Sequence, residues 1–388
     1  MINSSGNELG MDFDSPIDRR QTNSMKWDKY RGRDVIPLWV ADMDFRSPPS
    51  VIDALSRHAA HGVFGYPTVP PALVDIIQSR LDENYGWKVN EQWLVWIPGL
   101  VAGLNIACRA AGDDNDDVMT AVPVYPPFLK APEYSGRHLV TEPLALTGGR
   151  WEFDLDRIDS AIGPSTRLFI LCNPHNPVGR VYNRDDLTAL AGLCEKHDLI
   201  VCADEIHCDL ILDADKRHVP FAMLSPEVAD RTITLMAPSK TYNIPGLGCS
   251  FAVIPHPQLR QRFKVAMRGI VPMVNAMGFT AAQAAYRGGG EWLSALLSYL
   301  RRSRDIVATA IEQMPAVSAT HVEATYLTWI DTRETGIEDP VAFFEAAGVG
   351  LADGREFGGP GYVRLNFGCP HALLQRGLER MNSALEQL

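Results

Sequence analysis

Four side chains in the middle of this sequence have the chemistry to hold one cofactor between them. Lys240 carries an amine, which forms an imine with an aldehyde, and Asp204 carries a carboxylate, which keeps a pyridine nitrogen protonated. The amide of Asn176 can donate to a phenolic oxygen, and the ring of Tyr125 can stack on a pyridine face. Together they predict a cofactor that carries an aldehyde on a pyridine ring.

Each of these residues also has an ordinary structural interpretation. Asp204 can cap a helix, and Lys240 can be a solvated loop residue. Asn176 can belong to a turn before proline, and Tyr125 can pack in the core. Taken singly, the ordinary interpretation is favoured for each. The cofactor is predicted because all four follow directly after apolar runs of the chain, where an open parallel sheet collects its ligands.

The apolar runs predict the strands of such a sheet. They are bounded by Gly, Pro, Asn or Asp and cover residues 117–122, 167–172, 199–203, 232–236 and 249–254. Helical patterns lie between several of them, as at 184–197, where Asn183 can cap the first turn and Asp186 is its third residue. Runs that are apolar on both faces and alternate with helices predict an α/β fold with a largely parallel sheet, covered on both sides.

A second ligand feature precedes the first of these strands. Gly99 opens a helical pattern that continues to Ala111, so the free amides of its first turn and the positive end of its dipole face any bound anion. This indicates a phosphate cradle. The glycine pair Gly99 and Gly103 is a weak signal when taken alone, because such spacing more often serves helix packing.

The pattern changes after about Gly288. A glycine run at 288–290 precedes a helical stretch over 292–313, and shorter strand signals follow at 324–330 and 362–367, before a final amphipathic helix over 370–388. We predict a smaller α+β domain over residues 288–388, a large cofactor-binding domain over 46–287, and an N-terminal segment, 1–45, that joins the small domain.

Bulk composition excludes several classes of function. The 388 residues are 46% hydrophobic, enough for a sizeable core, and the formal net charge is -11 without a basic stripe. Nucleic acid and anionic membrane surfaces are therefore not expected partners. The first 20 residues are polar and acidic, and no apolar run reaches the length of a spanning helix, so we predict a cytoplasmic protein.

The seven cysteines are dispersed, odd in number and mostly set in apolar runs, which predicts reduced core residues and no disulfide framework. Cys202, His207 and Cys208 are close enough in sequence to suggest zinc. They lie along a strand pattern without a second ligand pair, so no metal site is predicted.

Several longer motifs resemble one known family. NPHNPVG at 173–179, DEI at 204–206 and SKT at 239–241 are similar to the fold type I class I/II aminotransferase superfamily, and the resemblance covers essentially the whole chain. NSMKWD at 23–28, WVADMDF at 39–45, DEIH at 204–207, SKTYNI at 239–244 and FGGPGYVRLN at 357–366 resemble its cystathionine β-lyase, or MalY/PatB-like C–S lyase, branch. The fold implied is a mostly parallel seven-stranded sheet with a smaller α+β domain.

The resemblance implies pyridoxal 5'-phosphate as the cofactor and a role for each matching residue. Lys240 would carry the cofactor as a Schiff base, Asp204 would face the pyridine nitrogen, and Arg364 would bind the substrate carboxylate. The other implied cofactor contacts are Asn176 at the 3'-oxygen, Tyr125 on the ring, and the amides of Leu100 and Val101 at the phosphate. Tyr66 matches a tyrosine that reaches the cofactor and substrate of the partner subunit, which implies a homodimer.

The chain departs from the usual aminotransferase pattern at three places. His207 occupies a position where many members have tyrosine, and it either donates weakly toward the cofactor or only packs. Gly248 replaces a phosphate-binding arginine, and Ala237 replaces a serine. The phosphate would therefore depend on Ser239, Tyr66 and the helix amides.

The branch resemblance implies a carbon–sulfur β-lyase that acts on cystathionine or related S-substituted cysteines. Two alternatives stay open, because Lys240, Asp204 and Arg364 serve each of them. One is an aminotransferase, and the other is a partner-binding regulator that keeps the cofactor pocket. The retention of the complete set of site residues counts against the regulator.

Overall fold

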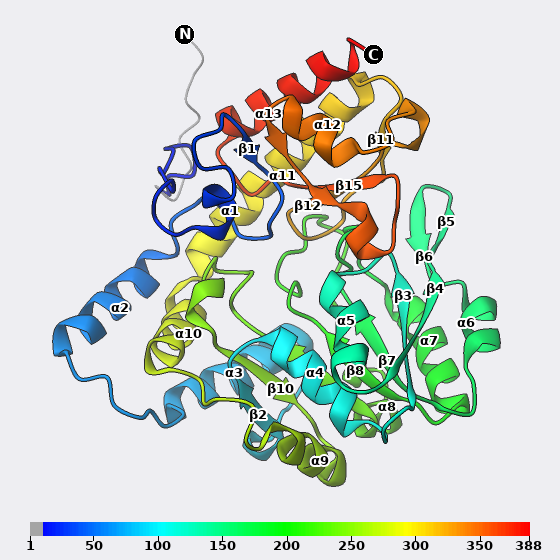
Figure 1. Cartoon of the computed structure of the whole chain (residues 1–388). Helices are drawn as coiled ribbons and strands as arrows, with labels where there is room; N and C mark the ends of the chain where they lie inside the picture. The colour runs from blue at the N-terminus through cyan, green and yellow to red at the C-terminus, as the bar shows by residue number, and fades with distance from the viewer. Residues whose placement is uncertain (1–10) are drawn as a thin grey trace.

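A seven-stranded sheet forms the larger part of the molecule. The computed structural model describes residues 11–388, and Figure 1 shows this sheet in its lower half. Every strand runs parallel to its neighbours except β10, which is antiparallel to both β2 and β9. The strand order is β2 (Leu94–Ile97), β10 (Ser250–Val253), β9 (Thr232–Met236), β8 (Ile200–Asp204), β7 (Thr166–Cys172), β3 (Asp117–Val122) and β4 (His138–Pro143).

Strand β7 shows why these strands appear in the sequence as apolar runs. Leu168, Ile170 and Cys172 pack into the core on one face of the sheet, and Phe169 and Leu171 pack into the core on the other. Helices α4, α5 and α9 cover the first face, while α6, α7 and α8 cover the second, with α3 and α10 next to them over β10. A strand buried on both faces carries apolar residues at nearly every position.

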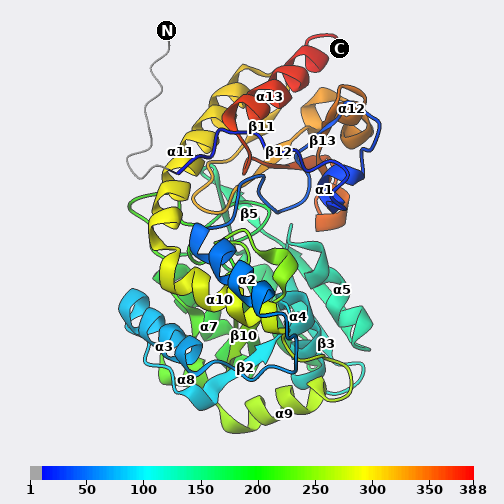
Figure 2. The ribbon, with the colours of Figure 1, turned by 90° about the vertical axis from the view of Figure 1, so that its left-hand side faces the viewer.

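The helices of the described chain have the following bounds: α1 Met25–Asp28, α2 Pro49–His61, α3 Pro71–Tyr85, α4 Leu100–Ala110, α5 Pro126–Tyr134, α6 Leu155–Ala161, α7 Arg184–Lys196, α8 Pro226–Asp230, α9 Pro257–Met267, α10 Ala276–Gly288, α11 Gly290–Gln313, α12 Pro340–Ala346 and α13 His371–Leu385. Figure 2 shows α2 and α10 side by side, and α11 running up to the second sheet.

The second sheet is antiparallel and contains four strands in the order β11 (Ser318–Ala319), β12 (Leu327–Asp331), β15 (Tyr362–Asn366) and β14 (Ala352–Asp353). It packs with α11, α12 and α13 in the upper half of Figure 1. The N-terminal segment joins this part, because β1 (Ile36–Pro37) pairs in parallel with β13 (Val349–Gly350). A separate hairpin pairs β5 (Ala145–Thr147) with β6 (Arg150–Glu152).

The predicted elements agree closely with the observed ones. Each of the five predicted strands of the large sheet is present, with ends that differ by no more than one residue. The predicted cap of α7 is a capping box, in which the Asn183 and Asp186 side chains each accept from the other's backbone amide. The fold class is confirmed, whereas the domain boundaries at residues 45 and 287 stay a prediction. The start of the predicted segment 1–45 lies outside the described residues.

Within residues 11–388 no helix is both long enough and apolar enough to cross a membrane. All seven cysteines are buried and unpaired, as predicted for core residues.

Candidate active site

The carboxyl ends of four parallel strands meet at one edge of the large sheet, and each supplies a predicted side chain. Asp204 is the last residue of β8. Asn176, Tyr125 and Lys240 follow β7, β3 and β9, which run parallel with β8. Because parallel strands end at the same edge of a sheet, the structure brings these four residues to one place.

Asp204 carries the most unusual electrostatics of the four. Its side chain is buried, with 5% exposed, and Oδ1 accepts from the backbone amide of Ile206 at 3.1 Å. No ion pair to it occurs within residues 11–388. Burial raises the pKa of its carboxyl to about 7, although the Ile206 amide and the Lys240 charge both act to lower it. An ionised Asp204 therefore needs a further cationic partner, and a protonated ring nitrogen would serve as one.

Lys240 is set deep enough for its amine to lose much of its basicity. Burial and the neighbouring charge of Arg364 lower its pKa to about 8, while the charges of Asp42 and Asp204 oppose that shift. The amine donates to the carbonyl oxygen of Ala41 at 2.5 Å. A lysine amine with a pKa of about 8 has a substantial neutral fraction at mildly alkaline pH, and the neutral amine can attack an aldehyde and accept a proton.

Arg364 reaches the site from β15 and contacts one of the four residues directly. Its Nη1 donates to Oδ1 of Asn176 at 3.0 Å, and its Nη2 donates to the carbonyl of Trp39 at 2.8 Å. Its Nε is buried without a partner in the described chain, and burial lowers the pKa of the guanidinium to about 10. A buried guanidinium with no carboxylate bonded to it is suited to bind an incoming carboxylate.

The same contact orients the side chain of Asn176. Because Oδ1 accepts from Arg364, the Nδ2 group is turned the other way and has no acceptor within residues 11–388. The predicted donor to the 3'-oxygen of the cofactor is therefore free to donate. Tyr125 is the N-cap of α5 and is partly buried, and burial raises the pKa of its phenol. Its ring packs with the apolar residues on either side of β3.

The first turn of α4 has the features of the predicted anion cradle. Gly99 is the N-cap and provides no side-chain cap, and no described residue accepts from the amides of Leu100 and Val101. A Cβ placed on Gly99 would meet nothing within 4 Å, so the space in front of the helix is open. Uncapped amides at the positive end of an eleven-residue helix are suited to hold a phosphate.

The structure gives a physical reason for the missing arginine at Gly248. This glycine has φ +55°, and a Cβ there would lie 3.0 Å from the carbonyl oxygen of Pro98. Both facts disfavour a residue with a side chain. Ala237 is buried, and Ser239 is partly exposed with a hydroxyl that has no hydrogen-bond partner in the described chain. The Ser239 hydroxyl is thus free to donate.

His207 is buried beside these residues as a neutral ring. Burial, followed by the charges of Lys240 and Arg364, lowers its pKa to about 3. Its Nδ1 has no partner within residues 11–388, and its ring lies edge-on to that of Tyr326, with 6.2 Å between centroids. No cluster of three or more His, Cys, Asp or Glu side chains in that range could hold a metal ion.

Tyr66 is the one predicted site residue that the single chain does not bring to this edge. It lies between α2 and α3, and 95% of its surface is exposed. In Figure 1 the segment that joins these two helices loops out from the body of the molecule. Within the single chain, Tyr66 therefore contacts none of the other predicted site residues.

The N-terminal segment 38–45 lines the site with backbone carbonyls, a role that the sequence analysis did not assign. Trp39 offers its carbonyl to Arg364, and Ala41 offers its own to Lys240. The carbonyls on either side of Ala41, those of Val40 and Asp42, accept from the amide of Asn366 at 2.6 and 2.8 Å. The segment is thus fastened to the strand that carries Arg364.

A second asparagine fastens the same segment to the loop that carries Lys240. Asn243 accepts from the amide of Met43 at 2.9 Å and donates to the carbonyls of Met43 and Phe45 at 2.9 and 2.8 Å. A signal was present in the sequence, since Asn366 is two residues after Arg364 and Asn243 three after Lys240. Side chains at such spacing can share a face with their neighbour.

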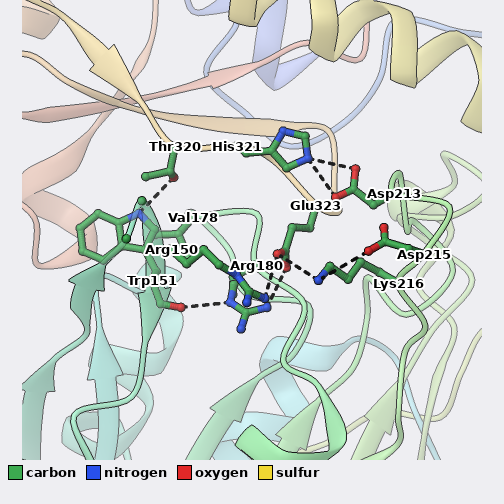
Figure 3. Close-up of a pocket in the computed structure, with 12 residues that line it drawn as sticks. Arg150, Trp151, Val178, Arg180, Asp213, Asp215, Lys216, Thr320, His321 and Glu323 are labelled. Atoms are coloured by element: carbon green, nitrogen blue, oxygen red, sulfur yellow. Dashed lines mark hydrogen bonds and ion pairs between the residues drawn. The ribbon is translucent and has the colours of Figure 1, made fainter.

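A cavity of about 400 Å³ lies elsewhere, beside the β5–β6 hairpin (Figure 3). Glu323 is its central carboxylate and pairs with Arg180 at 2.8 Å, Arg150 at 3.2 Å and Lys216 at 3.8 Å. Figure 3 shows these side chains pointing toward one another. Their charges are satisfied internally, and none of the predicted site residues lines the cavity, so we do not assign the active site there.

Comparison with known proteins identifies the class to which this site belongs. Residues 33–381 match the family described as aminotransferase class I and II. Since this match covers most of the chain, the protein belongs to that family. The prediction made from the motifs is confirmed at this level.

The relatives agree on the narrower branch. Cystathionine β-lyase PatB of Bacillus subtilis (strain 168) is 39% identical over 387 residues, which cover 97% of this chain and 100% of PatB. The crystal structure of OvoB matches with a TM-score of 0.95 and 47% identity, over 96% of this chain and 99% of OvoB. Cystalysin from Treponema denticola, whose structure contains pyridoxal 5'-phosphate, matches with a TM-score of 0.93 and 32% identity, over 97% and 99%. The predicted C–S lyase branch is thereby confirmed.

The buried charge of Asp204 leads to a prediction about the cofactor-free protein. The unfolded carboxyl ionises near pH 4 and the folded one near 7, so the folded state loses stability as the pH rises between these values. We expect Asp204→Asn to raise the free energy of unfolding of the cofactor-free protein at pH 8 by about 4 kcal/mol. At pH 4 the variant and the wild type should differ little. Urea denaturation at both pH values measures the free energy of unfolding. Equal stabilities of the variant and the wild type at pH 8 would contradict the raised pKa of Asp204.

Proposed function

We propose that this protein is a pyridoxal 5'-phosphate-dependent C–S β-lyase that cleaves cystathionine or related S-substituted cysteines. The observation that carries the proposal is the full-length similarity to PatB, which is named a cystathionine β-lyase, on a chain that retains Lys240, Asp204 and Arg364. The products are a thiol, pyruvate and ammonia.

The side chains at the sheet edge fit this cofactor. Asp204 lacks a cation, which the protonated pyridine nitrogen provides, and the free amide donors of Asn176 suit the phenolic oxygen. Tyr125 would cover the ring. The uncapped amides of Leu100 and Val101 would bind the phosphate, with Ser239 as a further donor.

When bound to Lys240, the cofactor supplies an electron sink that is conjugated with the α-carbon of an amino acid. Arg364 would bind the substrate carboxylate through its free N–H groups and hold the α-carbon in place. Lys240, released by the incoming amine, would take the α-proton, because its pKa of about 8 leaves about half of the amine neutral near pH 8. Buried and neutral, His207 adds no competing charge.

The elimination that follows leaves the protein unchanged and consumes one water molecule. The bond between the β-carbon and sulfur breaks, and the electron pair departs with sulfur, which becomes a thiol on protonation. The remaining three-carbon amine takes up water and separates into pyruvate and ammonia. The runner-up activity, transamination, would instead need a keto acid to accept the amino group and would release no thiol.

Activity with cystathionine distinguishes the two reactions. We expect the purified holoenzyme to release pyruvate and a free thiol from cystathionine without any added keto acid, and Lys240→Ala to lower that rate at least about 1000-fold. Lactate dehydrogenase coupling measures pyruvate, and a thiol reagent measures the second product. Amino-group transfer that depends on an added keto acid, with no thiol released, would favour the aminotransferase.

The active unit in this proposal is a homodimer in which Tyr66 completes the partner's site. Two large apolar side chains just before it in the chain are also exposed, namely Val63 at 65% and Phe64 at 63%. Ile270 and Met273, between α9 and α10, are exposed to 67% and 64%. Exposed apolar side chains in such numbers are typical of a protein interface. A second copy of the chain that covers them would bring Tyr66 to a site, as the family resemblance implies.

Mixing two inactive variants tests the shared site. A hybrid dimer of Lys240→Ala with Tyr66→Ala has one site free of both substitutions if Tyr66 acts on the partner, and no such site if it acts on its own chain. Random pairing should therefore restore about a quarter of the wild-type activity. Mixing Lys240→Ala with Arg364→Ala is the control, since these residues belong to one chain's site. Equal, low activity in both mixtures would contradict the sharing.

The remaining predictions from composition belong to the same proposal. The net charge of -11 supports a protein that binds a small amino acid and neither nucleic acid nor membrane. A cytoplasmic location and the division at residues 45 and 287 are proposed on sequence grounds.

A further inference from the structure

The amine of Lys240 and the hydroxyl of Tyr326 share one acceptor, the carbonyl oxygen of Ala41. The two distances are 2.5 and 3.0 Å. A carbonyl oxygen has two lone pairs and can accept both bonds at once. Tyr326 has only 1% of its surface exposed, so its hydroxyl can turn to few other acceptors. The Tyr326 hydroxyl thus helps to fix the position of the Ala41 carbonyl oxygen, which accepts from the Lys240 amine.

The Ala41 carbonyl is held in place on both sides. Asn366 binds the two adjacent carbonyls, and Asn243 binds the backbone of Met43. The acceptor is therefore set before any substrate arrives, which is the condition for electrostatic stabilisation without reorganisation.

Asp42 adds a negative charge next to this acceptor. Its Oδ2 pairs with Arg19 at 2.6 Å, whereas its Oδ1 is buried without a hydrogen bond in the described chain. A buried carboxylate oxygen without a hydrogen bond is unfavourable for folding, which points to a functional reason for Asp42 at this position. The charge of Asp42 raises the pKa of Lys240, against the effect of burial.

Charged or titratable groups act on the Lys240 amine from several parts of the chain. Arg364 of β15 disfavours a proton on it, while Asp42 and Asp204 favour one. The ring of His207, after β8, stays neutral under the same charges, and the phenol of Tyr326 has a pKa raised by burial. Of the two carboxylates, Asp204 is committed to the ring nitrogen in the proposed function. Asp42 pairs with Arg19 through Oδ2 and keeps its other oxygen, Oδ1, without a hydrogen bond in the described chain.

We infer that the Ala41 carbonyl, fixed by Tyr326 and flanked by Asp42, receives the Lys240 ammonium after that amine has left the cofactor and taken the α-proton. In this step the α-carbon–hydrogen bond would break and the new N–H bond would place a positive charge on Lys240, while the cofactor, when bound, would supply the sink for the electron pair. Tyr326 and Asp42 act through Lys240 and are positioning residues. This inference rests on the proposed function, from which it takes the proton transfer.

Exchange of the α-proton of L-alanine tests the inference separately from β-elimination. Alanine has no leaving group on its β-carbon, so the holoenzyme cannot eliminate from it. In D2O without any added keto acid, 1H NMR follows the replacement of its α-proton by deuterium. Two variants change the acceptor site while keeping its shape. Tyr326→Phe keeps the ring against His207 and removes the hydroxyl, and Asp42→Asn removes the charge.

We expect Tyr326→Phe to slow exchange about 10- to 100-fold, with unchanged cofactor content and unchanged affinity for alanine. In Asp42→Asn the acid limb of the exchange rate should move about one unit to lower pH, because Lys240 loses a charge that favours its protonated form. The pH at which the visible absorbance of the bound cofactor changes should move in the same direction. A residue that serves only folding would not shift either pH profile.

Matched controls are available on the surface of the chain. Tyr134→Phe removes a hydroxyl from a tyrosine that is 63% exposed, and Asp18→Asn removes a charge from the exposed ion pair with Arg20. Both should behave as the wild type.

A wild-type rate of exchange in Tyr326→Phe, or unchanged pH profiles in Asp42→Asn, would overturn the inference. If one of these two variants loses its cofactor on purification, the result for the other variant tests the inference. If the wild type exchanges the α-proton of alanine but releases no thiol from cystathionine, the proposed lyase activity is wrong, whereas the inferred role of the Ala41 carbonyl is unaffected.

Discussion

The carboxylate of Asp204 is buried at the end of a central strand, where no cation of the described chain pairs with it. A buried charge without a partner is costly, and here the cost appears as a pKa near 7. The rest of the site can be understood as the means of bringing a cation to this carboxylate and holding it there. The parallel sheet provides the edge. In the proposed function α4 would provide a phosphate anchor and Lys240 a covalent one, and the protonated ring nitrogen would offset the cost of burying the Asp204 charge.

The second sheet and the N-terminal segment add Arg364 and several backbone carbonyls to the site at the edge of the large sheet. Arg364 lies on β15, yet it bonds Asn176 of the large sheet and the backbone of Trp39. Asn366 and Asn243 fasten the same N-terminal segment to both parts. Arg364 and Lys240, to which we assign the substrate and the cofactor, and the carbonyls between them are therefore parts of one hydrogen-bonded unit, so their relative positions are set by short-range contacts.

Much of this arrangement could be predicted from the sequence, because it depends on local patterns. Strands buried on both faces are visible as apolar runs, and the polar residue that ends each run lies at the ligand edge. The roles of Ala41 and Tyr326 could not be predicted. A backbone carbonyl has no residue type to mark it, and Tyr326 looks like any core tyrosine until the fold brings it to Ala41. Gly248 was recognised as a departure, but only its backbone angle explains it.

The central claim is that the cofactor is bound covalently to Lys240, opposite Asp204. Reducing the holoenzyme with borohydride makes the bond between protein and cofactor permanent, and mass spectrometry of the digested chain then locates it. The account predicts a pyridoxyl-phosphate mass increment on the peptide that contains Lys240, and no such increment on any peptide of the Lys240→Ala variant. An increment on another lysine, such as the buried Lys26, or none at all in the wild type, would contradict it.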